Sequence, residues 1–234
     1  MNNKIVQYNY QIKKEKQKKV LYIFLFCIFL FVFINLILSY LIYPIHQNSL
    51  SMSPDISVDS VVMVSPVLAN YERGDIVLVK ARTDESESIS VFTKICSKIV
   101  SFFTLQRISL TENDKYPGTK QEIRRIIGMP GDTIYMRDYV TYVKPAGEKH
   151  FLTEFEITPK NYNVTFFIAP AGWDSALGVK GSFDEIKLGE NEYFVLGDNR
   201  KSSDDSRLWG PVTDEKIDAK VILCYFPFKK IKLL

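Results

Sequence analysis

The dominant feature of the hydrophobic pattern is an uninterrupted apolar run from Val20 to Tyr43. The run contains no charged residue, and Asn35 is its most polar member. As an α-helix it would be about 36 Å long, which is enough to cross a hydrocarbon core of about 30 Å with some tilt. A core helix of a soluble protein would show a polar face, which this run lacks. The pattern therefore predicts a transmembrane anchor over residues 20–43.

The flanks of the run indicate how the anchor is oriented. Residues 1–19 contain one acid, Glu15, against lysines at positions 4, 13, 14, 16, 18 and 19. Because lysine-rich flanks stay on the cytoplasmic side, we predict a cytoplasmic tail over 1–19 and an outward-facing domain over 44–234. A cleaved signal peptide is the main alternative, but its apolar core would span about 7–15 residues and end in small residues. This run is longer and continues into LIYPIHQNS, so an uncleaved single-pass anchor in the cytoplasmic membrane is favoured.

Beyond Pro44 the pattern changes to short apolar runs separated by Gly, Pro and Asp. These runs predict strands over 61–64, 75–79, 123–127, 133–136, 139–143, 193–196 and 221–226. Arg137-Asp138 separates the fourth and fifth runs, which suggests a tight hairpin. No alternation of helices and strands is visible, so we expect a mostly antiparallel β domain. Residues 89–105 instead have helical spacing, and fit either a helix packed on the sheet or an amphipathic segment on the membrane surface.

Composition and charge exclude several classes of function. A net charge of +3 argues against a general nucleic-acid binder. Cys27, Cys96 and Cys224 form no CxxC pair, and neither His46 nor His150 has a cysteine at metal-ligand spacing. We therefore expect neither a disulfide framework nor a metal site, and no nucleotide motif or other sign of a cofactor is present.

Four short motifs follow the anchor. The first, Ser49–Pro54, lies so close behind it that even an extended chain keeps Ser51 within about 26 Å of the membrane. The second, Arg73–Val79, is a turn that leads into a strand. The third, Arg124–Asp132, ends a strand in Gly-x-Pro-Gly-Asp. The fourth, Gly197–Arg207, mixes Asp, Ser and Arg densely, which suggests a hydrogen-bonded network that supports a site.

In this order, from about Ser49 to Phe228, the motifs resemble those of the type I signal peptidases. The resemblance implies a Ser/Lys dyad, an oxyanion hole, and a strand-lined groove that binds signal peptides with small residues at positions −1 and −3. It also implies a variable insertion over 81–118 and a cap subdomain over about 133–190. Position by position, it makes Ser51 the nucleophile, Ser49 an oxyanion-hole hydroxyl and Ser203 the serine that orients the base. The matching scaffold residues are Arg125, Asp198, Asp205 and Arg207.

The sequence departs from the family pattern at the general base. The family's lysine position is occupied by Arg124, followed by the expected Arg125. A base must lose its proton, and the pKa of arginine lies about 2–3.4 pH units above that of lysine. The difference corresponds to about 3–5 kcal/mol, or a rate lower by about 100 to 2,500-fold if all else were equal. Asp55 also replaces a usual threonine, and an acid there would stabilise a protonated partner.

Three interpretations remain. In the first, the chain is an active signal peptidase that uses Arg124 or a substitute base, for which Lys120, Lys94 and Lys98 are candidates. In the second, it is a catalytically silent relative that binds signal peptides or partners an active paralogue, and Arg124 is simply paired with an acid such as Glu122 or Asp205. In the third, it is an unrelated membrane-anchored β protein. His46 precedes Ser51 but fits a structural role better than that of a base.

The family resemblance favours the first interpretation. Its expected partners are the signal peptides of exported preproteins and the lipid bilayer, and the resemblance allows an association with the export machinery.

Overall fold

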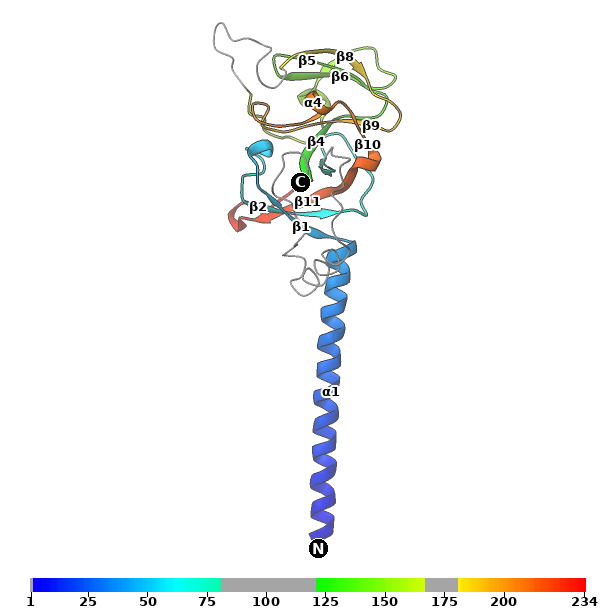
Figure 1. The fold of residues 1–234 in the computed structure, drawn as a ribbon, viewed down its shortest axis with the longest axis vertical. Coiled ribbons are helices and arrows are strands. Elements are labelled where there is room, and N and C mark those ends of the chain that lie inside the picture. The colour runs from blue at the N-terminus through cyan, green and yellow to red at the C-terminus, as the bar shows by residue number, and fades with distance from the viewer. Residues whose placement is uncertain (1, 81–120, 167–180) are drawn as a thin grey trace, which may run out of the picture.

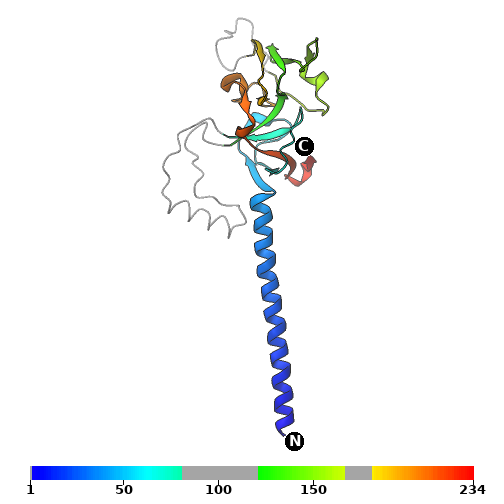
Figure 2. The same ribbon diagram turned by 90° about the vertical axis from the view of Figure 1, so that its right-hand side faces the viewer.

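The computed structural model describes residues 2–80, 121–166 and 181–234. A single long helix, α1 (Asn2–Tyr40), leads into a β domain built from two antiparallel sheets. Figures 1 and 2 show α1 projecting from one end of this domain, with the larger sheet next to the helix and the smaller sheet at the far end. The expected class, a mostly antiparallel β domain behind an apolar N-terminal helix, is confirmed.

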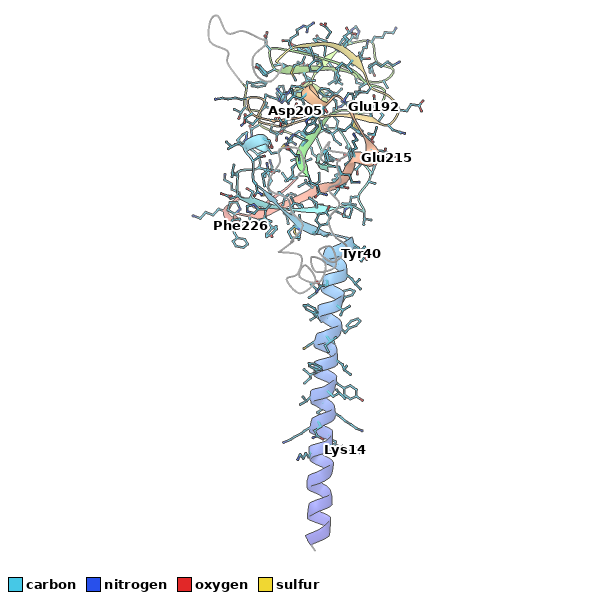
Figure 3. The ribbon with its side chains drawn as sticks, in the orientation of Figure 1. Lys14, Tyr40, Glu192, Asp205, Glu215 and Phe226 are labelled. Atoms are coloured by element: carbon cyan, nitrogen blue, oxygen red, sulfur yellow. The ribbon has the colours of Figure 1, made fainter. Side chains whose placement is uncertain are left out.

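Helix α1 extends through the basic segment and is long and apolar enough to cross a membrane. Its candidate span, Lys13–Ile37, has a mean hydropathy of 3.0. In its most apolar stretch of 18 residues, only 6% of the residues are buried. In Figure 3 the side chains drawn on this helix, including those of Lys14 and Tyr40, project outward from its axis. The helix ends before the apolar run does, because Tyr43 already begins strand β1 (Tyr43–Gln47).

The larger sheet contains β1 and six further strands in one path, with a seventh at its side. In chain order these are β2 (Ser60–Ser65), β3 (Ile76–Val79), β4 (Glu122–Gly128), β9 (Glu192–Leu196), β10 (Val212–Thr213), β11 (Ile217–Phe226) and β12 (Lys232–Leu233). The spatial order is β1-β2-β11-β3-β4-β9-β10, and β12 pairs with β11. Short helical turns lie at Leu50–Met52, Asp214–Lys216 and Phe228–Lys230, and helix α4 spans Ser206–Trp209.

The smaller sheet is formed by residues between the two halves of the larger one. Its strands are β5 (Thr133–Arg137), β6 (Val140–Lys144), β7 (Leu152–Thr153) and β8 (Phe183–Lys187), in the order β7-β6-β5-β8. Helix α3 (Glu154–Ile157) follows β7 directly and begins with a capping box in which Thr153 and Glu156 bond to each other's backbone N–H groups.

The central strands are apolar on both faces because both faces pack against a core. In β3, Ile76 and Leu78 belong to one buried cluster, whereas Val77 and Val79 belong to another on the opposite face. Such alternation follows from the two-residue period of a strand. Ile127 of β4 joins a third cluster that lies between the larger and the smaller sheet. Strand β4 is therefore fixed by packing on all sides, which matters because it carries Arg124 and Arg125.

The predicted hairpin between β5 and β6 is present, but its turn lies one residue further along. Arg137 pairs with Val140, so the turn residues are Asp138 and Tyr139 rather than Arg137 and Asp138. Both turn residues have positive φ angles, 48° and 66°, as a two-residue turn of this kind requires. The Tyr139 N–H donates to Gly181 O at 2.7 Å, which holds this uncommon conformation.

Several expectations fall outside the described residues. They are the helical segment 89–105, the insertion over 81–118, and the candidate bases Lys94, Lys98 and Lys120.

Candidate active site

Ser51 lies in the short helical turn between β1 and β2, and its side chain is buried. The residue is 2% exposed, and the following Met52 packs fully into the core of the larger sheet. The Ser51 carbonyl oxygen accepts a hydrogen bond from the Asn199 N–H at 2.8 Å, and Asn199 Nδ2 donates to Leu50 O at 3.2 Å. The first and the fourth sequence motifs therefore meet at the backbone of Ser51.

Three polar side chains contact the Ser51 hydroxyl. Ser49 Oγ lies 2.8 Å from Ser51 Oγ, Arg124 Nη1 donates to it at 3.0 Å, and Gln47 Nε2 donates to it at 3.3 Å. Gln47 was not among the sequence candidates. It is buried at the end of β1, four residues before Ser51 in the sequence.

Arg124 is one of the largest fully buried side chains in the described part of the chain. Besides Ser51 Oγ, its guanidinium donates to Asp204 O at 2.7 Å and to Ile123 O at 2.6 Å, and it forms an ion pair with Glu122. The ring of Trp209 lies 5.5 Å from its central carbon. The pairing with Glu122 is one of the two expected from the sequence.

Burial shifts the pKa values of this pair in opposite directions. Burial lowers the pKa of Arg124 below its ordinary value, although the neighbouring acids Glu122, Asp205 and Asp204 oppose the shift. Burial likewise raises the pKa of Glu122, and Arg124 only partly offsets it. A guanidinium starts from so high a pKa that Arg124 is charged near neutral pH, and in that form it has donors but no acceptor. Arg124 as placed therefore donates to Ser51 and does not accept the serine proton.

Arg125 points to the opposite face of β4 and holds the second and fourth motifs together. Its Nε and Nη2 donate to the two oxygens of Asp198 at 2.8 and 2.6 Å, and its Nη1 donates to Gly74 O at 2.9 Å. Asp55 Oδ2 also pairs with Arg125, at 3.1 Å. Asp55 therefore neutralises Arg125 and not the residue at the base position, which differs from what its nearness to Ser51 in the sequence suggested.

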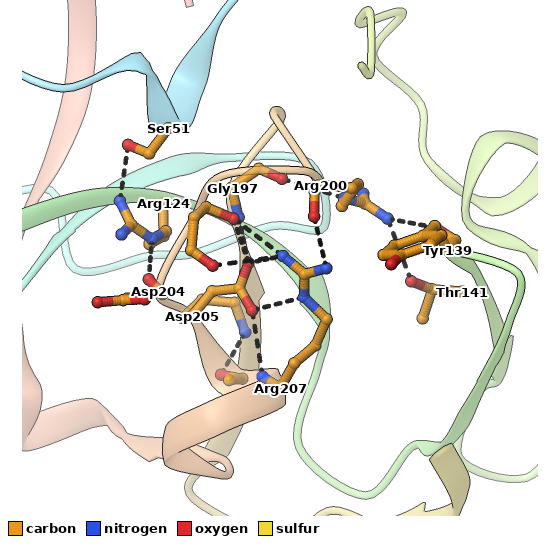
Figure 4. A network of polar contacts seen from close by, with 12 residues as sticks. Ser51, Arg124, Tyr139, Thr141, Gly197, Arg200, Asp204, Asp205 and Arg207 are labelled. Carbon is orange, nitrogen blue, oxygen red and sulfur yellow. Dashed lines mark hydrogen bonds and ion pairs between the residues drawn. The ribbon is translucent and has the colours of Figure 1, made fainter. Parts of the chain in front are cut away.

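The remaining scaffold residues form a compact group behind the site (Figure 4). Asp205 pairs with Arg207 through bonds of 2.8 and 2.7 Å, and Ser203 Oγ donates to Asp205 Oδ2 at 2.6 Å. Burial alone would raise the pKa of Asp205, but the bonds from Arg207 and Ser203 outweigh it and hold that pKa below its ordinary value. The Ser203 hydroxyl also accepts from Arg207 at 3.0 Å. Its hydrogen bonds thus go to Asp205 and Arg207, and its role in orienting a base stays a prediction.

Gly197 allows the fourth motif to approach the nucleophile. A Cβ at this position would lie 2.4 Å from Ser203 Cβ and 2.7 Å from the Ser51 carbonyl oxygen. Cβ atoms essentially never lie this close to another heavy atom, so only glycine fits without moving the backbone. This close approach explains why the fourth motif begins with glycine.

Among the described residues, the other candidate base, His46, does not reach the Ser51 hydroxyl. His46 is exposed and bonds to Asn48. Within the described residues, no group of three or more His, Cys, Asp or Glu side chains is arranged to hold a metal ion. The arrangement can present a buried serine hydroxyl to a carbonyl carbon, flanked by a second hydroxyl and a fixed positive charge.

Comparison with known proteins places this site in a protein class. Residues 19–226 match the family model described as "Signal peptidase, peptidase S26", and the chain belongs to this family. The family resemblance inferred from the four motifs is therefore confirmed.

Individual relatives in the same family are bacterial signal peptidases. The chain is 33% identical over 113 residues to signal peptidase I of Bacillus licheniformis, covering 47% of this chain and 53% of that protein. It is 28% identical over 148 residues to signal peptidase I of Bacillus amyloliquefaciens, covering 61% of this chain and 69% of that protein. The matched region thus spans about half the length of the first of these relatives. Among solved structures, a signal peptidase I from Enterococcus faecalis is 20% identical with a TM-score of 0.31, covering 64% of this chain and 96% of that one.

Proposed function

We propose that this chain is a membrane-anchored serine endopeptidase that removes signal peptides from exported preproteins, with Ser51 as its nucleophile. Membership of the signal peptidase family supports the class of reaction. The observation that carries the proposal is the contact of 3.0 Å between Ser51 Oγ and Arg124 Nη1. This contact brings the serine motif and the family's base position together in a buried site.

The proposed chemistry is acyl transfer in two steps. Ser51 Oγ attacks the carbonyl carbon of the residue at −1, and the C–N bond breaks with transfer of a proton to the leaving amine. Water then hydrolyses the ester and returns the proton to Ser51. The Ser51 N–H and the Ser49 hydroxyl, 2.8 Å from Ser51 Oγ, are the proposed donors to the oxyanion.

In this scheme Arg124 acts by its charge. A guanidinium that donates to Ser51 Oγ stabilises the negative charge developing on that oxygen, which favours loss of the serine proton. Ser49 is exposed and contacts Ser51 Oγ, so it offers a path by which solvent can take up the serine proton, and solvent then supplies the proton that the leaving amine gains. Lys94, Lys98 and Lys120 remain candidate bases in the segment beyond the described residues.

The proposed location follows from the anchor. Helix α1 fits a single membrane span, and its basic N-terminal segment favours the cytoplasmic side. The β domain would then face the outer side, close to the bilayer from which signal peptides emerge. The proposed partners are preprotein signal peptides, the lipid bilayer and, for delivery of substrate, the export machinery.

Incubation with a preprotein tests the proposal. The chain, purified in detergent, is mixed with a preprotein carrying small residues at −3 and −1. Cleavage is expected from the native chain and from Ser57→Ala, which removes a hydroxyl bound to Lys230 rather than one at the site. Ser51→Ala should show none. Equal cleavage by Ser51→Ala would overturn the assignment of the nucleophile.

A catalytically silent relative is the second candidate function. The observation that favours it is the ion pair between Arg124 and Glu122, which commits the family's base position to a permanent charge. This candidate predicts that the native chain binds a fluorescent signal peptide without cutting it. It also predicts that Arg124→Lys gains cleavage while Ser51→Ala/Arg124→Lys does not.

A further inference from the structure

We propose that Glu154, in the smaller sheet's helix α3, is a positioning residue that fixes Arg124 relative to Ser51 through Arg200. For its effect on catalysis this inference rests on the proposed function, but its geometric claim does not. Glu154 contacts neither Ser51 nor Arg124, and no sequence motif contains it.

The segment Gly197–Arg207, called here the site loop, touches both members of the candidate pair. Near one end, the Asn199 N–H donates to Ser51 O at 2.8 Å. Near the other end, Asp204 O accepts from Arg124 Nε at 2.7 Å. The relative position of the serine backbone and the guanidinium therefore depends on the shape of the site loop between Asn199 and Asp204.

Arg200 lies between those two contacts and points away from the site. Figure 4 shows its side chain directed toward Tyr139 and Thr141 of the smaller sheet, on the far side of the loop from Ser51. The side chain is fully buried. Its Nε donates to Gly197 O at 3.0 Å, within the loop, and its Nη1 donates to Tyr139 O at 3.1 Å. Arg200 thus joins the loop to the smaller sheet.

Glu154 neutralises Arg200 in this buried position. Arg200 Nη1 donates to Glu154 Oε1 at 2.7 Å, and Nη2 pairs with Oε2. The same carboxylate accepts from the Thr141 N–H at 3.2 Å and from the Tyr162 hydroxyl at 2.8 Å. Both carboxylate oxygens are used, and both charged side chains are excluded from water. A bidentate pair of this kind fixes orientation as well as distance.

Backbone contacts make the connection rigid. The Arg200 N–H donates to Thr165 O at 2.9 Å, and the Thr165 N–H donates to Asp198 O at 2.9 Å. In addition, the Tyr162 ring lies 4.3 Å from the guanidinium carbon of Arg125, which holds Asp198. With Arg200 fixed from both sides, a shift at Glu154 is passed on to Asn199 and Asp204 rather than absorbed by the loop.

The test compares Glu154→Gln with Glu156→Gln in the full chain in detergent. The control changes the same residue type in the same helix, but Glu156 faces solvent, and within the described residues its carboxylate bonds only to Thr153. Two quantities are measured: the steady-state constants for preprotein cleavage, and the side-chain Nε–H resonance of Arg124 in ¹⁵N-labelled protein, assigned from its loss in Arg124→Lys. Glu154→Asp and Tyr162→Phe provide milder changes if Glu154→Gln does not fold.

The expected result for Glu154→Gln is a kcat lower by about 100-fold with KM little changed, since displacement of reacting groups by about 1 Å has effects of this size. The Arg124 resonance should shift with it, and Glu154→Asp should restore part of both. An unchanged Arg124 resonance in folded Glu154 variants would overturn the inference. If the native chain does not cleave, the proposed function fails, whereas the resonance still decides whether Glu154 positions Arg124.

Discussion

Arg124 donates a hydrogen bond to Ser51 across a distance of 3.0 Å, from β4 to the turn that follows β1. The direction of this bond matters, because a charged guanidinium has no lone pair with which to accept the serine proton. The same side chain is held by Asp204 O and paired with Glu122, so it cannot easily turn away. The contact that defines the candidate site is thus also the feature that separates it from a Ser/Lys dyad.

Replacing this arginine by lysine should increase proteolysis. Arg124→Lys introduces a group whose pKa can fall far enough for it to act as a base when buried. We expect kcat/KM for preprotein cleavage to rise by up to about 100 to 2,500-fold. Glu122 would stabilise the charged lysine, so Arg124→Lys/Glu122→Gln should show the larger gain. Loss of activity in folded Arg124→Lys would show instead that the guanidinium itself is needed.

The Ser49 hydroxyl should contribute to catalysis without being required for folding. Ser49 is exposed and lies 2.8 Å from Ser51 Oγ. Removal of one oxyanion donor lowers kcat by about 100 to 1,000-fold in other serine enzymes, and we expect Ser49→Ala to fall in this range with KM almost unchanged. Ser49→Thr keeps a hydroxyl and should retain most of the activity. Steady-state kinetics on all three forms would show whether the hydroxyl or merely the side-chain volume matters.

Where strands are buried on both faces, the sequence was sufficient to predict them. Strands β3 and β9 are rich in apolar residues, and β4 has apolar residues on both sides of its two arginines. The predicted positions of all three agree with the structure to within about a residue. Strand β1 was not predicted, because its first residues continue the apolar run of the anchor. Strand β8 was missed for the opposite reason: most of its side chains are exposed or half-buried, so it carries little apolar signal.

The residues of the candidate site also divide into those that the sequence could predict and those that it could not. Ser51, Arg124, Arg125, Asp198 and Asp205 belong to motifs, and the structure brings these motifs together. Gln47 and Glu154 belong to none. Glu154 reaches Arg200 only because the smaller sheet folds back over the site loop, and such a contact leaves no local pattern in a single sequence. Of the residues that contact the nucleophile, Ser49 and Arg124 could therefore be named in advance from motifs, whereas Gln47 could not. Glu154, which holds the surrounding loop through Arg200, could not be named either.

A methyl group at Gly197 should disturb the site more than the fold. In Gly197→Ala the new Cβ would meet Ser203 Cβ at 2.4 Å and Ser51 O at 2.7 Å. Overpacking of this kind costs about 1–3 kcal/mol, and here it would push the site loop away from the nucleophile. Gly189→Ala is the control, since its new Cβ would meet only the flexible Glu192 side chain, at 3.2 Å. Preprotein cleavage should fall sharply in Gly197→Ala and remain near the native rate in Gly189→Ala.

The buried pair of Glu154 and Arg200 should make stability depend on pH in acid. Burial by itself would raise the pKa of Glu154, but the charge and hydrogen bonds of Arg200 outweigh it and hold that pKa below its usual 4.5. At pH values between the pKa of Glu154 in the folded chain and its pKa in the unfolded chain, the unfolded chain binds more protons than the folded one. The stabilisation is therefore present above pH 4.5 and is lost as the pH falls through the pKa of Glu154 in the folded chain. The lowered pKa of Asp205 makes stability depend on pH in the same direction as that of Glu154. The raised pKa of Glu122 makes it depend on pH in the opposite direction.

Glu154→Gln should therefore destabilise the folded domain most at neutral pH. Leaving Arg200 buried without its partner carboxylate costs about 3–5 kcal/mol at pH 7, and this difference from the native chain should shrink as the pH falls below 4.5. This difference in the free energy of unfolding is measured by urea unfolding of Glu154→Gln and of the native chain, in detergent, at several pH values. Glu185→Gln, on the exposed side of β8, controls for the loss of one carboxylate and should differ little from the native chain at any pH. A difference for Glu154→Gln that grows toward acid would contradict the prediction, because it would mean that the folded state holds Glu154 protonated.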